Sequence, residues 1–273
     1  MIFSTLATES CHLVPSGCGF PAPSADIFFL EPYASFSIFG MNFEVSKTVI
    51  LVTMVALIVV GFFLAAFRAP KIVPGKLQSI GEQAYLFIRD QIAREVIGSD
   101  GDRFVPFLGS LFFFVWIANL MGVIPGAQFP VMASLAFPVS LTLMVYVTYV
   151  VIGMKSQGAI KFFTNAAFPP GVPKVMYVLL TPLELLGLLV TRPVTQAIRL
   201  FANMFAGHLL ITTFTVGAWY LFSPSVIGAL GSVTSFGVTV VLTGFEMFIQ
   251  GLQAFIFTLL TAVYIGGSLH AEH

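Results

Sequence analysis

The sequence TVILVTMVALIVVGFFLAAF, residues 48–67, holds no charged side chain and lies between Lys47 and Arg68. A helix of about 20 apolar residues is long enough to cross the hydrocarbon core of a bilayer, which is about 30 Å thick. The stretch therefore predicts a transmembrane helix, and it decides the fold class of the chain.

The composition of the whole chain agrees with this assignment. Of its 273 residues only 9% are charged and 58% are hydrophobic, and 12 basic residues balance 12 acidic ones. A typical soluble domain carries about 25% charged residues, and so apolar a chain cannot cover a globule with polar surface. It also lacks the basic excess of a nucleic-acid-binding protein. We therefore expect an all-α integral membrane protein whose partners include the lipid bilayer but no nucleic acid.

The middle of the chain predicts two further crossings. No residue between Arg103 and Lys155 is charged, and this stretch is too long for one span. The Pro- and Gly-containing sequence GVIPGAQFP, residues 122–130, predicts a turn that divides it into helices at 104–124 and 131–153.

The last two hydrophobic segments are unusually long. After Lys174 the chain is apolar almost to its end, and the sequence SPS at 223–225 divides it into 175–221 and 226–268. Each piece exceeds one perpendicular crossing. We expect an antiparallel hairpin of two long and strongly tilted helices.

The basic residues predict the orientation. Segment 68–103 holds six Lys and Arg residues and segment 154–174 holds three, whereas the tail 1–47 holds one. The positive-inside rule places both basic segments in the cytoplasm and the N-terminal tail outside. The expected divisions are an extracytoplasmic tail 1–47, a helix 48–67, a cytoplasmic segment 68–103, a helical hairpin 104–153, a cytoplasmic loop 154–174, the long hairpin 175–268 and a cytoplasmic tail 269–273.

Residues 77–97 differ from the spans because charged side chains interrupt them. Their apolar side chains recur at helical spacing, which predicts an amphipathic helix on the cytoplasmic membrane surface. Two interpretations are open: a connector held at the interface by apolar burial, or a docking element for a partner. The apolar positions are Leu77, Ile80, Ala84, Ile88, Ile92 and Val96.

The N-terminal tail offers little. Cys11 and Cys18 lie on the expected outer side, where either a disulfide or two free thiols fits the sequence. The start of the chain lacks the basic region and cleavage site of a signal peptide, so we expect no removed leader. No internal repeat supports the inverted-repeat design of many transporters.

Arg199 lies among apolar residues, where a charge at mid-bilayer costs about 2.5–3.5 kcal/mol on insertion scales. Because an arginine stays protonated, it cannot relay protons, but it can repel cations and attract a carboxylate. At about 100° per residue, it shares one helical stripe with Arg192, Gln196 and Asn203. A purely structural role is the alternative for Arg199, and snorkelling to the interface accounts for Arg192.

The last segment carries a second polar stripe, made by Glu246, Gln250 and Gln253, with Thr residues one and two turns earlier. His208 lies on the preceding helix, almost opposite Arg199. Imidazole and carboxyl groups can hand on protons, and two striped helices can enclose a hydrated path. A buried structural ion pair or hydrogen bond between His208 and Glu246 is the alternative.

Catalytic chemistry is not indicated. The sequence has no HExxH, no phosphate-binding GxxxxGK[ST], no GxGxxG after a strand and no cluster of metal ligands, so we expect no cofactor or metal. His270 and His273 are expected in a solvated tail.

Four stretches of the sequence stand out, at residues 104–126, 181–200, 199–208 and 252–267. They resemble subunit a of the F-type ATP synthase, the stator half of its membrane motor. The resemblance covers about residues 70–270 and is weakest in the N-terminal tail. It implies a subunit without catalytic activity of its own, whose partners are a ring of subunit c, the peripheral stalk of subunit b and the remaining subunits. The stretches are RLFANMFAGH (199–208), LQAFIFTLLTAVYIGG (252–267), FVPFLGSLFFFVWIANLMGVIPG (104–126) and TPLELLGLLVTRPVTQAIRL (181–200).

The resemblance also implies roles for single residues. Arg199 matches the arginine that faces the rotor ring, and Asn203 and Gln253 match polar residues beside it. His208 stands where some bacterial members carry Glu, and Glu246 stands where they carry His. The acid and the imidazole are thus exchanged between the two helices. The residues implied to translocate protons are Arg199, Asn203, His208, Glu246, Gln253 and Glu184; those expected to line or support the path are Gln250, Gln196, Asn119 and Arg192.

The mechanism implied is proton flow through two offset half-channels, which turns the ring and drives ATP synthesis. Glu184 matches a position on the cytoplasmic exit path, whereas Gly122 stands where some bacterial members carry Asp, which puts an entry path through that position in doubt. The rival hypotheses are a stand-alone cation channel or proton-coupled transporter, and a structural scaffold. The expected location is a bacterial plasma membrane, with the mitochondrial inner membrane as the alternative.

Overall fold

The computed structural model describes residues 20, 23–28, 33–38, 41–124, 126–168, 176–223 and 225–269. The predictions for Cys11, Cys18, His270 and His273 lie outside these described residues.

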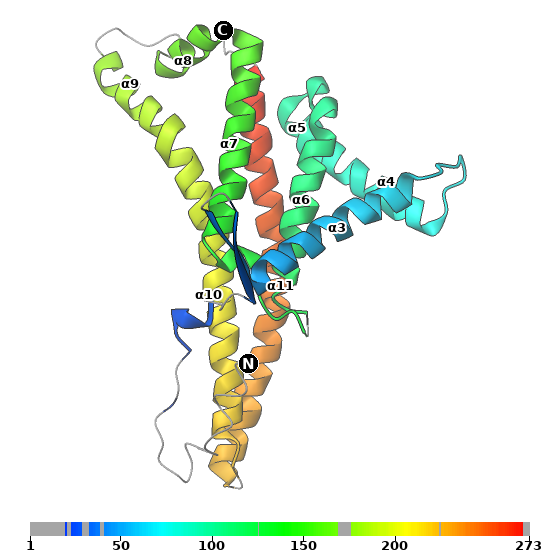
Figure 1. The fold of residues 1–273 in the computed structure, drawn as a ribbon, viewed down its shortest axis with the longest axis vertical. Helices are drawn as coiled ribbons and strands as arrows, with labels where there is room; N and C mark the ends of the chain where they lie inside the picture. The colour runs from blue at the N-terminus through cyan, green and yellow to red at the C-terminus, as the bar shows by residue number, and fades with distance from the viewer. Residues whose placement is uncertain are drawn as a thin grey trace.

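Five helical segments in the described ranges are long and apolar enough to cross a membrane (Figure 1). The predicted all-α membrane protein with five hydrophobic segments is thereby confirmed. The last two segments are twice as long as the others, at 45 and 44 residues. The segments are Lys47–Phe67, Ser99–Leu120, Ala136–Gln157, Tyr177–Leu221 and Val226–Leu269.

Several of these segments contain more than one helix. The second begins with a 3-10 turn, and the fourth contains a π-helical turn between two α-helices. The helices of the spans are α3 (Lys47–Phe67), η3 (Ser99–Phe104), α6 (Val105–Leu120), α7 (Ala136–Gln157), α9 (Tyr177–Leu186), η6 (Gly187–Thr191), α10 (Arg192–Leu221) and α11 (Val226–Leu269). The shorter helices are η1 (Ala25–Phe28), α4 (Lys76–Ile88), η2 (Arg89–Ala93), α5 (Arg94–Ile97), η4 (Val131–Ala133) and α8 (Ala159–Ala167).

A small β-hairpin precedes the first span. Strands β1 (Ala34–Ile38) and β2 (Met41–Val45) pair antiparallel, with Ala34 opposite Val45. The sequence analysis did not predict this hairpin. It lies outside the five spans, so the part of the fold built from them is helical.

The predicted amphipathic helix forms α4, η2 and α5. The predicted apolar positions are buried only in part: Ile88 and Ile92 are fully buried, whereas Leu77 and Ile80, predicted on the same face, are exposed. Buried apolar residues of α3 and α6, among them Val55 and Leu108, belong to the same core cluster. Burial against the spans thus holds this segment in place.

The two longest helices form an antiparallel hairpin. Near the turn, the Ser232 hydroxyl donates to the Ala218 carbonyl at 2.7 Å and the Ser235 hydroxyl donates to the Phe214 carbonyl at 2.8 Å. At the other end of α10, the Gln196 amide donates to the Phe257 carbonyl at 3.3 Å. The two helices lie side by side along most of their length in Figure 1. Their predicted tilt against the membrane plane stays a prediction.

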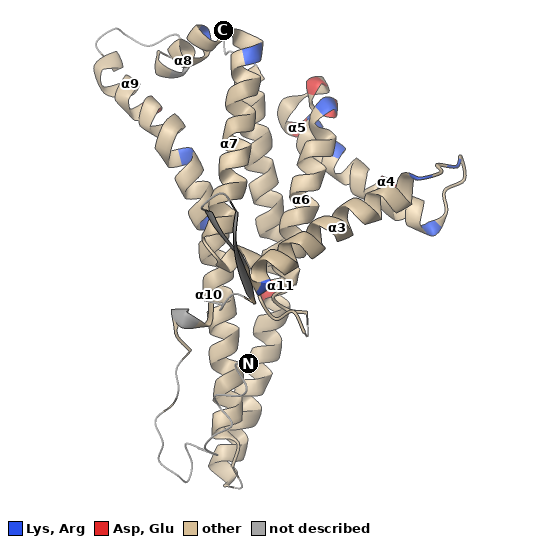
Figure 2. Cartoon of the chain, viewed as in Figure 1, with Lys and Arg blue, Asp and Glu red and all other residues tan. Residues whose placement is uncertain are grey.

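Charged residues gather at one end of the molecule. Lys and Arg lie around α4, α5 and the neighbouring ends of α7 and α8, whereas the end that holds the turn between α10 and α11 has none among the described residues (Figure 2). The positive-inside rule makes this asymmetry relevant to the predicted orientation, which stays a prediction.

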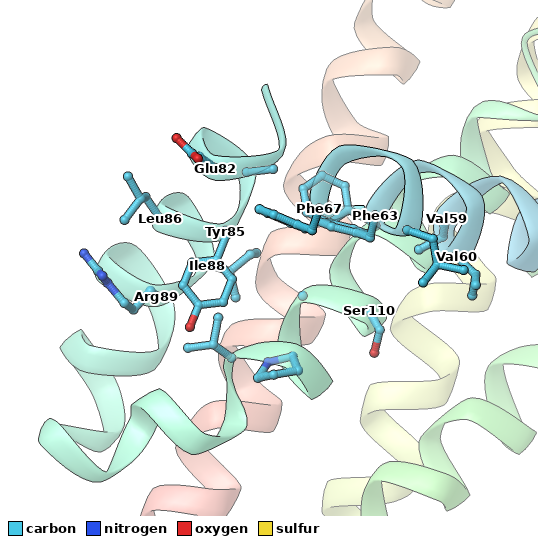
Figure 3. A pocket seen from close by; sticks show the side chains of 16 residues that line it. Val59, Val60, Phe63, Phe67, Glu82, Tyr85, Leu86, Ile88, Arg89 and Ser110 are labelled. Atoms are coloured by element: carbon cyan, nitrogen blue, oxygen red, sulfur yellow. The ribbon is translucent and has the colours of Figure 1, made fainter. Parts of the chain in front are cut away.

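A cleft of about 760 Å³ opens between α3, α4 and the start of α6 (Figure 3). Its walls are apolar side chains such as Phe63, Phe67 and Tyr85, and Glu82 and Arg89 lie at its edge. No residue of α10 or α11 lines it. The cleft is therefore separate from the polar stripes of the long hairpin.

Gly101 is buried where η3 passes the π-helical turn η2. A Cβ at this position would overlap the Ala93 carbonyl, a backbone group that cannot move aside. We expect Gly101→Ala to lower the free energy of unfolding by about 1–3 kcal/mol, the usual cost of overpacking. Thermal unfolding in detergent measures this, with Gly75→Ala as the control because its Cβ would meet open space. Equal midpoints for the two variants would contradict the prediction.

Candidate functional site

A side-chain hydrogen bond joins the polar stripes that were predicted on the last two segments. The Asn203 amide of α10 donates to the Gln253 side-chain oxygen of α11 at 2.7 Å. Arg199 lies one turn before Asn203 and is exposed, as is Asn203 itself. The structure thus brings Asn203 and Gln253 together and leaves the Arg199 guanidinium at the edge of the contact between α10 and α11.

Gln196 extends the same contact one turn further. Its side chain is buried, and its amide also donates to the Thr261 hydroxyl at 3.3 Å. The polar stripe of α10 therefore turns from a buried side, at Gln196, to an exposed side, at Arg199. A fixed cation at this edge can meet a group on another chain.

Glu246 lies deep between α10 and α11, with only 5% of its surface exposed. The Gln250 amide donates to its Oε1 atom at 3.5 Å, and its Oε2 atom has no hydrogen-bonding partner among the described residues. A Cβ on Gly207 would lie 3.2 Å from the Glu246 carboxyl carbon. The carboxyl group thus packs on α10 against Gly207, the residue that precedes His208 in the sequence.

His208 is half-buried and has an aromatic neighbour. Its ring packs edge-on against Phe28 of η1, at 5.9 Å between ring centroids. In the part of the chain that the structure describes, no ion pair joins His208 to Glu246. The static ion pair considered above is therefore not formed in this structure.

Further polar side chains are buried without a partner. Asn119 of α6 is fully buried, and neither atom of its amide has a hydrogen-bonding partner among the described residues. The same holds for the Thr142 hydroxyl, the Gln250 Oε1 atom and the Gln253 Nε2 atom. Unpaired polar atoms are costly in a dry interior. These unpaired atoms lie on α6, α7 and α11.

Glu184 and Arg192 lie outside this contact. Glu184 is half-buried on α9, and no hydrogen bond or ion pair joins it to the polar residues just described. The Arg192 guanidinium lies over the Tyr264 ring, 5.5 Å from its centroid. A cation–π contact of this kind gives Arg192 a structural partner inside the chain.

Gly207 and Tyr264 were missed by the sequence analysis as neighbours of the site. Gly207 carries no functional group, and its proximity to Glu246 depends on how α10 and α11 are aligned. The one available signal was the run of small residues at Ala202, Ala206 and Gly207, which permits close helix approach. Nothing in the spacing pointed to Tyr264.

The described residues contain no group of three or more His, Cys, Asp or Glu side chains that could hold a metal ion. What the fold and the site define is a membrane protein of five helical spans, whose two longest helices enclose a polar contact and present one arginine at its edge.

Comparison with known proteins identifies the family. The family described as "ATP synthase A chain" matches residues 48–266. ATP synthase subunit a of Streptomyces lividans is 45% identical over 275 residues, covering 98% of this chain and 94% of its own length. The subunit of Frankia alni is 43% identical, covering 93% and 88%, and that of a Parafrankia species is 40% identical, covering 95% and 88%. The chain belongs to the ATP synthase subunit a family, which confirms the resemblance.

The contact between Gly207 and Glu246 leads to a prediction. Because an added side chain must push the carboxyl group aside, we expect Gly207→Val to reduce proton pumping by the assembled complex about tenfold. Gly237→Ala is the matched control on α11, because its Cβ meets nothing within 4 Å. Pumping is measured in inverted vesicles. Pumping at the parental rate in the valine variant would mean that the position of Glu246 is unimportant.

Proposed function

We propose that this chain is the membrane-embedded stator subunit of a bacterial proton-translocating ATP synthase, and that it forms two offset half-channels against a rotor ring of subunit c. Family membership supports the assignment to the ATP synthase. The single observation that carries the mechanism is the placement of Arg199: exposed on α10, one turn from the Asn203–Gln253 hydrogen bond, within a mostly apolar span.

In this proposal the entry path runs past His208 and Glu246. The Glu246 carboxyl is buried with one oxygen unpaired, and buried polar atoms of Gln250 and Asn119 are also unpaired. Such atoms are commonly satisfied by internal water, which needs several polar partners to occupy a site. A proton passes along this path to a carboxylate on the ring, and the neutral carboxyl can then enter the lipid.

Arg199 separates the two half-channels. Its permanent charge attracts the ionised ring carboxylate and repels a proton that would pass directly across the membrane. The carboxyl releases its proton on arrival, and the proton leaves past Glu184 towards the end of the molecule that carries the basic residues. The driving force is about 2.3 kcal/mol per charge per 100 mV.

The exposed surface of the long hairpin supports a ring partner. Only 6% of the residues in the most apolar stretch of the fourth span, and 17% in that of the fifth, are buried by the rest of the chain. Exposed small residues, Ala202 and Ala206, allow close approach of another helix. The peripheral stalk of subunit b is a further expected partner. The relatives are bacterial, which supports the bacterial plasma membrane as the location. The positive-inside rule supports an N-terminus outside and a C-terminus in the cytoplasm.

Reconstitution tests the proposal against its rivals. The purified chain alone and the whole complex are placed in liposomes, and proton flux is followed with a pH-sensitive dye. We expect flux coupled to ATP hydrolysis from the complex and background flux from the chain alone. A chain that conducts protons by itself at the rate of the complex would favour the stand-alone channel and overturn the half-channel proposal.

A further inference from the structure

The backbone hydrogen bonds change register just before α10. In the π-helical turn η6, the Arg192 amide donates to the Gly187 carbonyl, five residues back instead of four. The Leu188 carbonyl would pair in the same register with the amide of residue 193. That residue is Pro193, which has no N–H. Because the Arg192 amide is already used, no helical donor is available to the Leu188 carbonyl.

A side chain from another span supplies the missing donor. The Tyr149 hydroxyl of α7 donates to the Leu188 carbonyl at 3.4 Å, across 39 residues of sequence. Tyr149 is only 2% exposed, and its ring packs against Tyr146 and Tyr264, at 5.2 and 5.6 Å between centroids. The rings hold the hydroxyl in place, and a buried carbonyl that would otherwise stay unpaired is satisfied.

The π-helical turn decides which way Arg199 points. Arg199 follows Leu188 by 11 residues, which is three turns and about 20° in an uninterrupted α-helix. Arg199 would then share the buried face of Leu188. Because the π-helical turn takes up one extra residue, Leu200 occupies that face instead. Leu188 and Leu200 are 3% and 0% exposed, and Arg199 is exposed.

We propose that Tyr149 is a positioning residue: its hydroxyl replaces the amide that Pro193 lacks, and so stabilises the π-helical turn that places Arg199 on the exposed face of α10. In this proposal Tyr149 acts on the backbone at Leu188 and not on a translocated proton. The effect expected on pumping rests on the function proposed above for Arg199, whereas the effect on helix register does not.

The test uses the assembled complex with Tyr149→Phe, which removes only the hydroxyl, beside Tyr146→Phe as the matched control from the same cluster. We expect Tyr149→Phe to lower ATP-driven pumping about fivefold, because the buried Leu188 carbonyl loses the hydroxyl that donates to it. Adding Pro193→Ala restores an amide at residue 193, and the double variant is expected to recover at least half of the parental rate. Loss of ring packing alone would not be repaired by a change on another helix.

A second readout follows the register directly. Leu200 is buried in the parental register, so a Leu200→Cys variant provides a reporter thiol at a buried position. We expect this thiol to react with N-ethylmaleimide about fivefold faster when Tyr149→Phe is also present. Adding Pro193→Ala is expected to slow the reaction again. Tyr146→Phe should leave the rate unchanged. Unchanged labelling with Tyr149→Phe, or a double variant that labels as fast as Tyr149→Phe, overturns the inference. Changed labelling with unchanged pumping would instead mean that the role proposed for Arg199 is wrong.

Discussion

Arg199→Ala is expected to reduce ATP-driven proton pumping at least about tenfold, while the complex stays assembled. The side chain is exposed at the edge of the α10–α11 contact, so its loss creates no cavity in the core of the chain. In the mechanism proposed above, the variant loses the fixed charge that stabilises an ionised carboxylate opposite it in a medium of low dielectric constant. Pumping is measured in inverted vesicles, and assembly by co-purification of the ring.

The control for this variant is Arg68→Ala, which removes an exposed arginine from the linker after α3. We expect it to pump at the parental rate. A passive proton leak through membranes that contain the Arg199 variant would add that the arginine seals the path between the half-channels. Pumping at the parental rate by Arg199→Ala would show that the residue is structural, and the mechanism proposed here would then be wrong.

An exchange of His208 and Glu246 gives the second large effect. Each single variant, His208→Glu or Glu246→His, puts two like groups at one level of the hairpin, and we expect either one to reduce pumping at least about tenfold. The double exchange restores one imidazole and one carboxyl group. Because the Glu246 carboxyl packs against Gly207, the residue before His208, we expect the double variant to regain a substantial part of the rate.

A further variant distinguishes a proton relay at His208 and Glu246 from a structural pairing of the two residues. Glu246→Gln keeps the shape and the bond with Gln250 but cannot carry a proton, so a relay predicts loss of pumping in a fully assembled complex. Glu95→Gln, on the exposed surface of α5, is the matched control. Retained pumping in Glu246→Gln, or a double exchange no better than the single variants, would contradict a proton relay at these two positions.

The five spans could be predicted because charges are rare and their gaps match the thickness of a bilayer. The predicted start of the third helix, residue 131, is less accurate, since α7 begins at Ala136. Pro130 is followed by a short 3-10 turn that buries Val131 and Met132, and an apolar run that is buried in a turn cannot be told from a helix by hydropathy.

The helical-wheel argument applies within α10 and cannot be extended back across its beginning. From Arg192 onward the chain is a regular α-helix, so a step of about 100° per residue places Arg199 and Asn203 correctly on one side. The π-helical turn changes the rotation per residue, and no periodicity in the sequence predicts it. Contacts such as Gly207 with Glu246 depend on the alignment of two helices, which the pattern of a single helix does not contain.

The exposure of Arg199 and Asn203 has a consequence for how the protein is made. A newly inserted copy that has not met its neighbours presents a guanidinium and an amide directly to lipid, at a cost that the surrounding apolar residues must offset. We expect an unassembled copy to be less stable in the membrane and to be degraded sooner than an assembled one. We therefore expect the lifetime of each copy to depend on the order in which the membrane subunits are synthesised.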